Sequence, residues 1–585
     1  MDTAATPANE APGDTSNDSQ PTLAVDRGTR SSDDSSPSQP RFGMPLLDAA
    51  WGNNLANVEA LLRGNAQDVR AAHKRTGFTA LHIAASRGFV ALVCTLLRTA
   101  HVSVDARDAR QRTPLFYAAH RKNCQCAQAL LDAGADASAT DVQGWTPFAA
   151  AAAEGQLEAV KLLVTVHGVD PNARNNTGRT PLAAAAVRGH LPVICFLYEE
   201  LGCDPTTPTY EECTPLLVAA HQGHADCVRY LASLPDASVT RCNGKGASPL
   251  YCAAARGHLE VVRCLVADLR VDIHKGDNAY HREPLLVAAF EGHPAVVELL
   301  LTVPGIDPGA ADDKGWTPLM AACFNGHLQV VHALLADHRV CATQSCPKGI
   351  TPFYAACFQG HLAIAKLLAP HADPYHLDKN NYSPLSAAAS AGHLHVVEWL
   401  VADGVCRLPL LASTASVAPL MAAGTSGQAD VVAFLLQQKV DASAGANGWT
   451  PLHAAVAWSR AAAVKQFLCH SFIDVNATNR FGFTPLLTAC QTGHAEIVAD
   501  LLKRQDLDVS QRLASGLTCV HVAALHGHVE VLRCLLTHEG ILSHRSGQPP
   551  QHGVARRLCS RSRRGDNTAA HRPRCPHRKD ECSQS

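Results

Sequence analysis

A short phrase recurs along this chain of 585 residues at a spacing of about 34 residues. One copy reads TPLMAACFNGHLQVV, at residues 317–331, and its slots return with small changes. The first position of the phrase falls at Thr79, Thr113, Thr146, Thr180, Thr214, Ser248, Glu283, Thr317, Thr351, Ser383, Ala418, Thr450, Thr484 and Thr518. A more divergent copy begins at Met44, which makes fifteen repeats. Such a fixed period predicts a solenoid whose repeats stack only on their neighbours.

Each slot of the repeat has a local structural role. Thr or Ser followed by Pro predicts a helix start. The hydroxyl accepts a hydrogen bond from an amide of the first turn, and Pro at the first helical position loses no hydrogen bond because an amide there has no partner within the helix. Nine residues after the Thr, most repeats have a Gly, which ends a helix cheaply in the left-handed conformation. A second apolar helix follows, for example at residues 259–268. The predicted fold is therefore an all-α repeat solenoid of helix-turn-helix repeats, joined by short hairpin turns.

Three places depart from this pattern. Lys122 and Ser459 stand where other repeats have the helix-ending Gly. The connection over residues 403–420 is the least regular of all. Two interpretations of residues 400–465 stay open: a softer joint in the stack, or sequence drift with ordinary packing.

Several stretches of the repeat resemble a known family. TALHIAASRGF (79–89), TPLAAAAVRGHLPVICFL (180–197) and GWTPLHAAV (448–456) are similar to the ankyrin repeat, whose signature is Thr-Pro-Leu-His-x-Ala-Ala-x-x-Gly-His. The resemblance spans residues 44–540. It implies a non-catalytic scaffold or adaptor that binds a partner protein in a concave groove lined by the hairpin turns and the first helices. The alternative is the substrate-recognition arm of a larger complex, such as a ubiquitin ligase.

Certain positions of the ankyrin repeat face this groove, namely the two residues before the Gly and the residue before the Thr. Aromatic and apolar residues gather there in successive repeats: Phe290, Phe324 and Phe358, accompanied by Trp316, Ile350 and Tyr382. Because stacked helices lie about 8–10 Å apart, the three Phe rings should form a ladder roughly 20 Å long. Contiguous apolar patches and aromatic anchors are typical of partner sites, so we predict binding there. The alternative, that the rings pack as ordinary core, stays open.

A second set of groove positions is basic. Its members are Arg87, Arg121, Arg188 and Arg256. Guanidinium groups pair well with carboxylate or phosphate, so the row suits an acidic partner segment. The alternative is that these arginines face solvent and bind nothing. Glu154 favours this alternative, because it interrupts the row of arginines.

Histidines follow the Gly in register, at His190, His224, His258, His293, His327, His361, His393, His494 and His528. Repeats about 10 Å apart cannot share a zinc ion, whose ligand nitrogens lie about 2.1 Å from the metal. We therefore predict that these imidazoles hydrogen-bond to backbone between repeats, and we expect no metal. The Gly244-Lys245-Gly246 stretch does not match a phosphate-binding loop, and the metalloprotease and serine-hydrolase motifs are absent. We expect neither enzymatic activity nor a cofactor.

The two ends differ from the repeats. Residues 1–43 are rich in Ser, Asp, Pro and Thr, and this composition predicts a disordered segment. Residues 541–585 are basic, and we predict a disordered tail there. Such a run of basic residues is typical of nuclear-import signals and of nucleic-acid-binding segments, which would make the chain a nuclear regulator. Cys575, His577 and Cys582 do not match the spacing of a standard zinc site.

Composition sets the remaining expectations. A formal charge of -2 gives no sign of a bulk attraction to nucleic acid or membrane. The 22 cysteines fall mostly inside apolar helical runs, so they indicate small buried side chains in a reducing compartment. We expect a monomeric intracellular protein in the cytoplasm, with the nucleus as the alternative that the basic tail raises. Its expected partners are other proteins, with no membrane contact.

Overall fold

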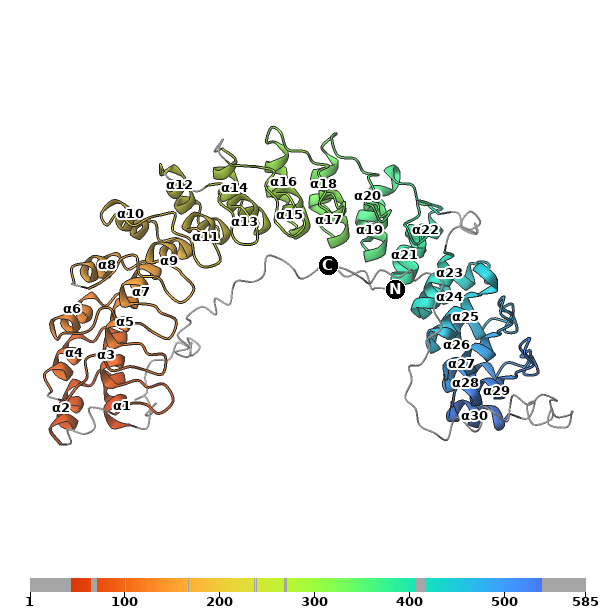
Figure 1. Cartoon of the computed structure of the whole chain (residues 1–585), viewed down its shortest axis with the longest axis horizontal. Coiled ribbons are helices and arrows are strands. Elements are labelled where there is room, and N and C mark those ends of the chain that lie inside the picture. Colours follow the sequence, from red (N-terminus) through yellow and green to blue (C-terminus); the bar gives the residue numbers. More distant parts are fainter. Residues whose placement is uncertain are drawn as a thin grey trace. The chain divides into compact units, whose positions relative to one another are not determined.

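The computed structural model describes residues 44–64, 71–99, 101–166, 168–235, 237, 239–267, 271–406, 417–443 and 445–538 (Figure 1). These residues form thirty short α-helices and no strands, in fifteen successive pairs. The predicted all-α repeat solenoid is thereby confirmed. The disorder predicted for residues 1–43 and 541–585 lies outside the described residues, as does the part of the irregular connection over residues 407–416.

The first helix of each repeat carries an odd number. These helices are α1 (Pro45–Trp51), α3 (Ala80–Arg87), α5 (Pro114–His120), α7 (Pro147–Ala153), α9 (Pro181–Arg188), α11 (Pro215–Gln222), α13 (Pro249–Ala255), α15 (Pro284–Glu291), α17 (Pro318–Asn325), α19 (Pro352–Gln359), α21 (Pro384–Ala391), α23 (Pro419–Ser426), α25 (Pro451–Ala457), α27 (Pro485–Thr492) and α29 (Cys519–Leu525).

The second helix of each repeat carries an even number. These helices are α2 (Leu55–Gly64), α4 (Val90–Leu97), α6 (Cys124–Asp132), α8 (Leu157–Val164), α10 (Leu191–Glu199), α12 (Ala225–Ser233), α14 (Leu259–Val266), α16 (Pro294–Leu301), α18 (Leu328–Leu335), α20 (Leu362–Leu368), α22 (Leu394–Ala402), α24 (Ala429–Gln437), α26 (Ala461–Leu468), α28 (Ala495–Leu501) and α30 (Val529–Leu536). Two single 3-10 turns lie at Ala369–His371 and Ala446–Gly448. None of the helices in the described part of the chain is long and apolar enough to cross a membrane.

The helix starts and ends follow the local rules of the repeat. The Thr180 hydroxyl accepts a hydrogen bond from the Ala183 amide at 3.2 Å, and Pro181 occupies the first helical position. Gly189 ends α9 with a φ of 76°. Lys122 and Ser459 adopt the same left-handed backbone, with φ values of 68° and 59°. These two departures therefore keep the shape of the repeat, at a backbone cost of about 1–2 kcal/mol each.

The His of the Thr-Pro-Leu-His slot joins its own helix to the next hairpin. In α3, the Nδ1 atom of His82 accepts from the Thr79 amide at 3.2 Å, and Nε2 donates to the Arg112 carbonyl at 3.0 Å. His453 makes the same two bonds in α25, to Thr450 and to the Phe483 carbonyl. Both rings are fully buried, and burial lowers the pKa of each. The Nδ1 bond needs the neutral imidazole, because a protonated Nδ1 cannot accept, and the lowered pKa favours the neutral form.

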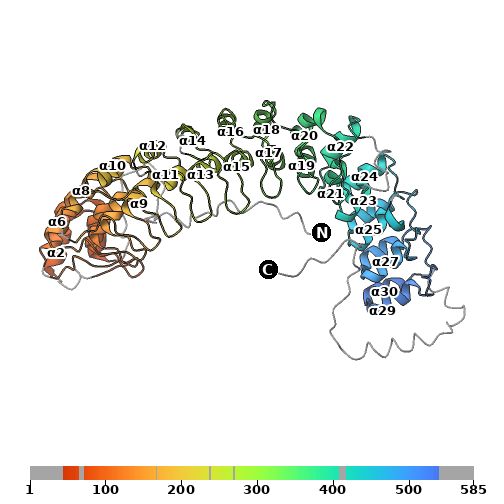
Figure 2. The ribbon, with the colours of Figure 1, turned by 45° about the horizontal axis from the view of Figure 1, so that its top comes forward.

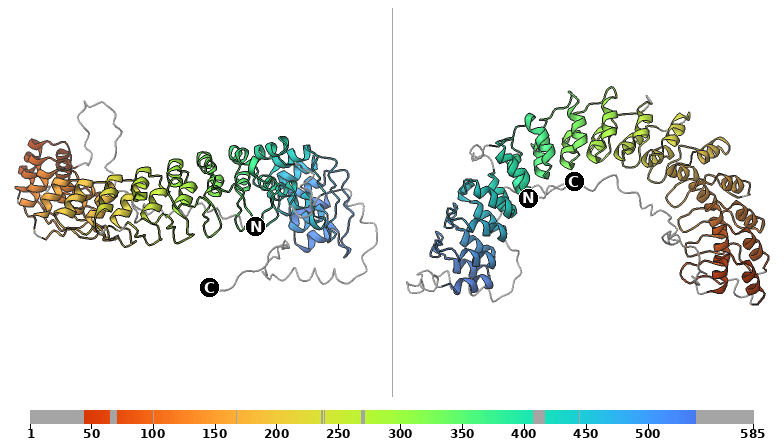
Figure 3. Two further views of the ribbon diagram at one scale, coloured as in Figure 1. Left: turned by 90° about the horizontal axis from the view of Figure 1, so that it is seen from above. Right: turned by 180° about the vertical axis from the view of Figure 1, so that it is seen from behind.

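The chain divides into two compact units. Unit 1 comprises Met1–Ala356 and Ala363–Ala372, and unit 2 comprises Cys357–Leu362 and Asp373–Ser585. In unit 1 the first helices form one row and the second helices form another, as the right view of Figure 3 shows. The two rows are likewise present in unit 2, from α21 to α30, and α23 to α26 form ordinary helix pairs. The softer joint at residues 400–465 stays a prediction.

Small side chains allow the first helices to approach closely. In α9, Ala183, Ala184, Ala185 and Ala186 are each at most 2% exposed. Leucine and valine of the second helices, such as Val193 and Leu197 in α10, fill the space behind them. This alternation of small and large side chains makes one continuous apolar core within each unit, since every repeat buries its faces against its neighbours.

Hairpins connect each repeat to the next, and their tips are joined by backbone hydrogen bonds. Figure 2 shows the hairpins of unit 1 as loops that extend beyond the first helices, away from the second helices. Tip amides donate to the preceding hairpin at 2.9–3.0 Å, from Ala109 to Thr76, Val142 to Arg110, Asn176 to Gln143, Tyr210 to Thr177, Gly244 to Glu211, Asn278 to Lys245 and Asp313 to Tyr280. The hairpins of unit 1 are therefore held in register independently of their tip side chains.

The histidines that follow the Gly make a second set of links between repeats. Nε2 of His224 donates to the Val187 carbonyl at 2.9 Å, and Nε2 of His327 donates to the Phe290 carbonyl at 3.0 Å. Where the His is missing, another donor replaces it: Asn123 Nδ2 donates to the Ala85 carbonyl at 2.8 Å. The predicted bonds between imidazole and backbone are confirmed at these positions.

Candidate protein-binding surface

An aromatic pair lies where the hairpin before α17 meets the end of that helix. The Asp312 carboxylate fixes the hairpin by accepting hydrogen bonds from the amides of Lys314 and Trp316, at 2.9 and 2.8 Å. This places the Trp316 ring edge-on against the Phe324 ring, with centroids 5.1 Å apart and planes at 89°. Both side chains are half-buried, whereas the neighbouring Cys323 is fully buried. An edge-to-face pair of this kind gives a rigid apolar surface.

Cationic side chains and further rings adjoin this pair on the hairpin before α15. Arg282 lies over the rings of Tyr280 and Phe290, with its Cζ atom 5.2 and 6.0 Å from their centroids. Lys314 of the next hairpin places its Nζ atom 3.8 Å from the Tyr280 centroid. The surface thus combines apolar rings with cations, and this mixture is common in protein interfaces.

Arg282 is held in place by a buried carboxylate. Its Nε and Nη2 atoms donate to Asp277 Oδ2 at 2.9 and 2.7 Å. The Tyr251 hydroxyl donates to the same oxygen at 3.1 Å. Burial alone would raise the pKa of Asp277, but hydrogen bonds from the Tyr280 amide and from Arg282 lower the pKa overall. Arg282 is consequently a fixed support for the rings above it.

The six residues predicted to bind a partner are all half-buried: Phe290, Trp316, Phe324, Ile350, Phe358 and Tyr382. The structure brings Trp316 and Phe324 into contact. Phe358 and Tyr382 belong to unit 2 and the other four to unit 1. Half burial fits neither a fully buried core nor a fully exposed row. The three-ring ladder therefore stays a prediction.

The four arginines of the predicted basic stripe are all exposed: Arg87, Arg121, Arg188 and Arg256. Arg87 and Arg188 contact other side chains of the protein. The Cζ atom of Arg87 lies 4.3 Å from the Trp51 ring centroid, and Arg188 Nη1 lies 3.0 Å from Glu154 Oε1. Glu154 also lies 3.2 Å from His120 Nε2, so it connects two repeats.

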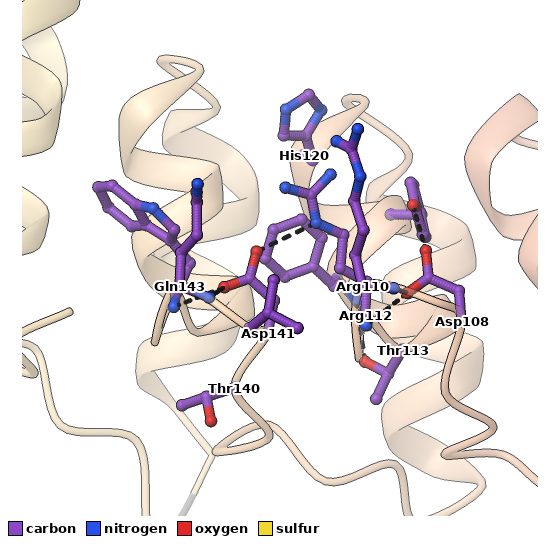
Figure 4. A network of polar contacts seen from close by, with 12 residues as sticks. Asp108, Arg110, Arg112, Thr113, His120, Thr140, Asp141 and Gln143 are labelled. Atoms are coloured by element: carbon purple, nitrogen blue, oxygen red, sulfur yellow. Dashed lines mark hydrogen bonds and ion pairs between the residues drawn. The ribbon is translucent and has the colours of Figure 1, made fainter. Parts of the chain in front are cut away.

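Sequence reasoning missed a buried polar network at the base of two hairpins, which Figure 4 shows. Asp108 Oδ1 accepts from the amides of Arg110 and Arg112, both at 2.8 Å, and its Oδ2 accepts from the Tyr117 hydroxyl at 2.7 Å. In the next hairpin, Asp141 Oδ2 accepts from Arg112 Nε at 3.1 Å. Asp or Asn five residues before the Thr recurs along the chain, so the sequence carried a signal for this role.

Four of the described thiols are held in the protonated form by burial. Burial raises the pKa of Cys126, Cys203 and Cys227 to about 11 and that of Cys252 to about 12. Such thiols are protonated at neutral pH and are poor nucleophiles. No group of three His, Cys, Asp or Glu side chains in the described part of the chain is placed to hold a metal ion.

Comparison with known proteins agrees with this architecture. The family model described as "Ankyrin repeats (3 copies)" matches residues 46–141, 134–209, 201–277, 269–345, 285–378, 339–408, 409–479 and 457–546. The chain is 35% identical over 121 residues to ankyrin repeat protein nuc-2 of Neurospora crassa, a match that covers 20% of this chain and 11% of that protein.

A second relative is the ankyrin repeat and KH domain-containing protein mask-1 of Caenorhabditis elegans. The chain is 32% identical to it over 120 residues, which are 20% of this chain and 4% of that protein. The matched stretches are thus small parts of both relatives. With the family model matching from residue 46 to residue 546, the chain belongs to the ankyrin-repeat family.

Proposed function

We propose that this chain is a non-catalytic scaffold or adaptor, which binds a partner protein on the face formed by its first helices and hairpins. Ankyrin repeats are generally protein–protein interaction modules without catalytic activity. The observation that carries the proposal for this chain is the half-buried Trp316–Phe324 pair, with its rings edge-to-face at 5.1 Å. Trp and other aromatic residues anchor most protein interfaces.

The backbone around the pair supports this role. The hairpin that carries Trp316 is fixed by Asp312, and its tip is joined to the previous hairpin by the bond from Asp313 to Tyr280 at 3.0 Å. A rigid aromatic surface loses little conformational entropy when a partner binds. The pair therefore suits a binding role better than a mobile side chain would.

The test compares Phe324→Ala with wild type in the full chain. Tagged proteins capture partners from a cell extract, quantitative mass spectrometry identifies those partners, and the affinity of each is then measured. We expect Phe324→Ala to weaken the main partner by roughly 30-fold, corresponding to a hot-spot loss of about 2 kcal/mol.

A matched control is Phe196→Ala. Phe196 is also half-buried, but it lies in the second helix α10. Phe196→Ala should change the affinity for the main partner by less than about twofold. Circular dichroism should show that Phe196→Ala and Phe324→Ala both keep their helices. Equal losses in the two variants, or no loss in Phe324→Ala, would contradict the proposed binding face.

A further inference from the structure

The guanidinium of Arg112 has a donor that the fold leaves unused. Its side chain is 3% exposed, and its Nε atom donates to Asp141 Oδ2 at 3.1 Å. The other oxygen of Asp141 is occupied, because it accepts from the amides of Gln143 and Trp145 at 2.9 and 3.0 Å. The Nη1 atom is buried and has no acceptor among the described residues. A buried donor without an acceptor costs about 1–3 kcal/mol.

His120 lies beside this guanidinium, with its Nε2 atom 3.2 Å from Glu154 Oε1. It is stacked on Phe116, with ring centroids 6.2 Å apart and an interplanar angle of 20°. The Cζ atom of Arg112 lies 4.8 Å from the centroid of the same ring. The Nδ1 atom of His120 is buried and makes no hydrogen bond within the described structure. Phe116 thus supports two neighbouring donor groups.

Two exposed arginines are close to these groups along the chain. Figure 4 shows that the side chains of Arg110 and Arg112 extend the same way, toward the side where His120 lies. Arg121 follows His120 directly and is exposed at the end of α5. We name Arg110, Arg112, His120 and Arg121 the anion cradle. Arg110 is exposed, so its guanidinium can meet an anion that approaches Arg112 from solvent.

The charges around the cradle indicate which anion fits. Four guanidinium groups are present there: Arg110, Arg112, Arg121 and Arg188. Three carboxylates offset them: Asp108, Asp141 and Glu154. Four minus three leaves one positive charge, which balances one carboxylate, whereas a phosphate group carries nearly two negative charges at neutral pH.

We propose that the anion cradle binds a single carboxylate, from a Glu or Asp side chain of the partner protein. This rests on the proposed function and adds to it a chemical requirement on the partner. The partner carboxylate accepts hydrogen bonds from Arg112 Nη1 and from the arginines at the rim, and charge-assisted bonds of this type are the strong ones. Two residues of the predicted basic stripe, Arg121 and Arg188, belong to this region, whereas Arg87 and Arg256 do not.

The test uses fluorescein-labelled hexaglutamate as the probe, with hexaglutamine and a phosphoserine hexapeptide beside it. Fluorescence anisotropy reports binding to the full-length chain and to Arg110→Gln and Arg121→Gln. The matched control is Arg256→Gln, since Arg256 is exposed and holds the same slot of its repeat as Arg121. We expect Arg110→Gln and Arg121→Gln each to weaken hexaglutamate about fivefold to tenfold, and Arg256→Gln to change it less than twofold.

Three outcomes would overturn the carboxylate proposal: no binding of hexaglutamate by wild type, equal weakening by Arg256→Gln, or tighter binding of the phosphoserine peptide than of hexaglutamate. Phe324→Ala separates the two proposals, because it should weaken the captured partner and leave hexaglutamate binding unchanged. If the partner binds Arg110→Gln and Arg121→Gln as tightly as wild type, the cradle proposal fails while the scaffold proposal stands.

Discussion

Two buried tyrosines provide a test of how the hairpin carboxylates are satisfied. Tyr117 and Tyr251 are at most 1% exposed, and each donates its hydroxyl to an aspartate, Asp108 at 2.7 Å and Asp277 at 3.1 Å. Replacing either tyrosine by Phe keeps the ring and removes only the hydroxyl. The two changes differ in what they leave behind.

The expected magnitudes follow from the remaining donors. Tyr117 is the one side chain in the described structure that donates to Asp108 Oδ2, so Tyr117→Phe leaves a buried carboxylate oxygen unsatisfied. Hydrogen bonds to charged groups contribute about 1.5–3 kcal/mol, and we expect a loss of about 2 kcal/mol. Asp277 Oδ2 keeps both donors of Arg282 in Tyr251→Phe, so we expect a loss of about 1 kcal/mol or less.

Hydrogen–deuterium exchange of the full chain is the suitable assay, because a repeat array need not unfold in one step and exchange reports local stability. At about 1.36 kcal/mol per factor of ten, protection of α5 should fall roughly 30-fold in Tyr117→Phe. Protection of α13 should fall at most about fivefold in Tyr251→Phe. Equal losses of amide protection in α5 and α13 would refute the reasoning. The cost of removing a tyrosine hydroxyl would then depend on its burial alone and not on the donors that remain to the carboxylate.

Two further predictions concern single groups. Glu283 is the N-cap of α15 but makes no side-chain cap hydrogen bond. Glu283→Thr should therefore stabilise α15 by about 1 kcal/mol, measured as slower amide exchange in that helix. Unchanged amide exchange in α15 would contradict this prediction. Burial lowers the pKa of His82 and His453 below the ordinary value of 6.5, so the unfolded chain binds their protons more readily. Stability is fully present above pH 6.5 and is lost as the pH falls through the lowered pKa values. Calorimetry should therefore show a lower melting temperature at pH 5.5 than at pH 7.5, and a constant one would exclude this linkage.

Features that depend on a single local rule, such as helix starts and helix ends, were predicted correctly from the sequence. The Thr-Pro starts and the Gly ends need only hydrogen-bond and backbone arguments, and Thr180 and Gly189 behave as those arguments require. Lys122 shows the limit, because the sequence marked it as a departure whereas its backbone takes the left-handed conformation. The bond between Arg112 and Asp141 was missed because it joins different repeats through side-chain directions, which periodicity does not give.

The aromatic residues at the groove positions show the same limit of periodicity. Register placed Phe290 and Phe324 in one slot, and the structure shows a contact that register does not predict, between Phe324 and Trp316 of the same repeat. Whether a ring at a repeat position meets the ring above it or the hairpin beside it depends on rotamers. Spacing alone fixes only which side chains share a face.

The division of roles among side chains explains why recognition can vary while the fold does not. Hairpin tips are joined through backbone, as from Val142 to Arg110, and the slot after the Gly needs only a donor, which His224 or Asn123 supplies. Stacking at these places therefore depends on backbone groups and on one donor, so the other tip side chains can vary with less effect on the fold. Where the base of a hairpin holds a buried donor without an acceptor, as at Arg112, the fold accepts a cost that a partner would offset, and that is the reason to look for the partner there.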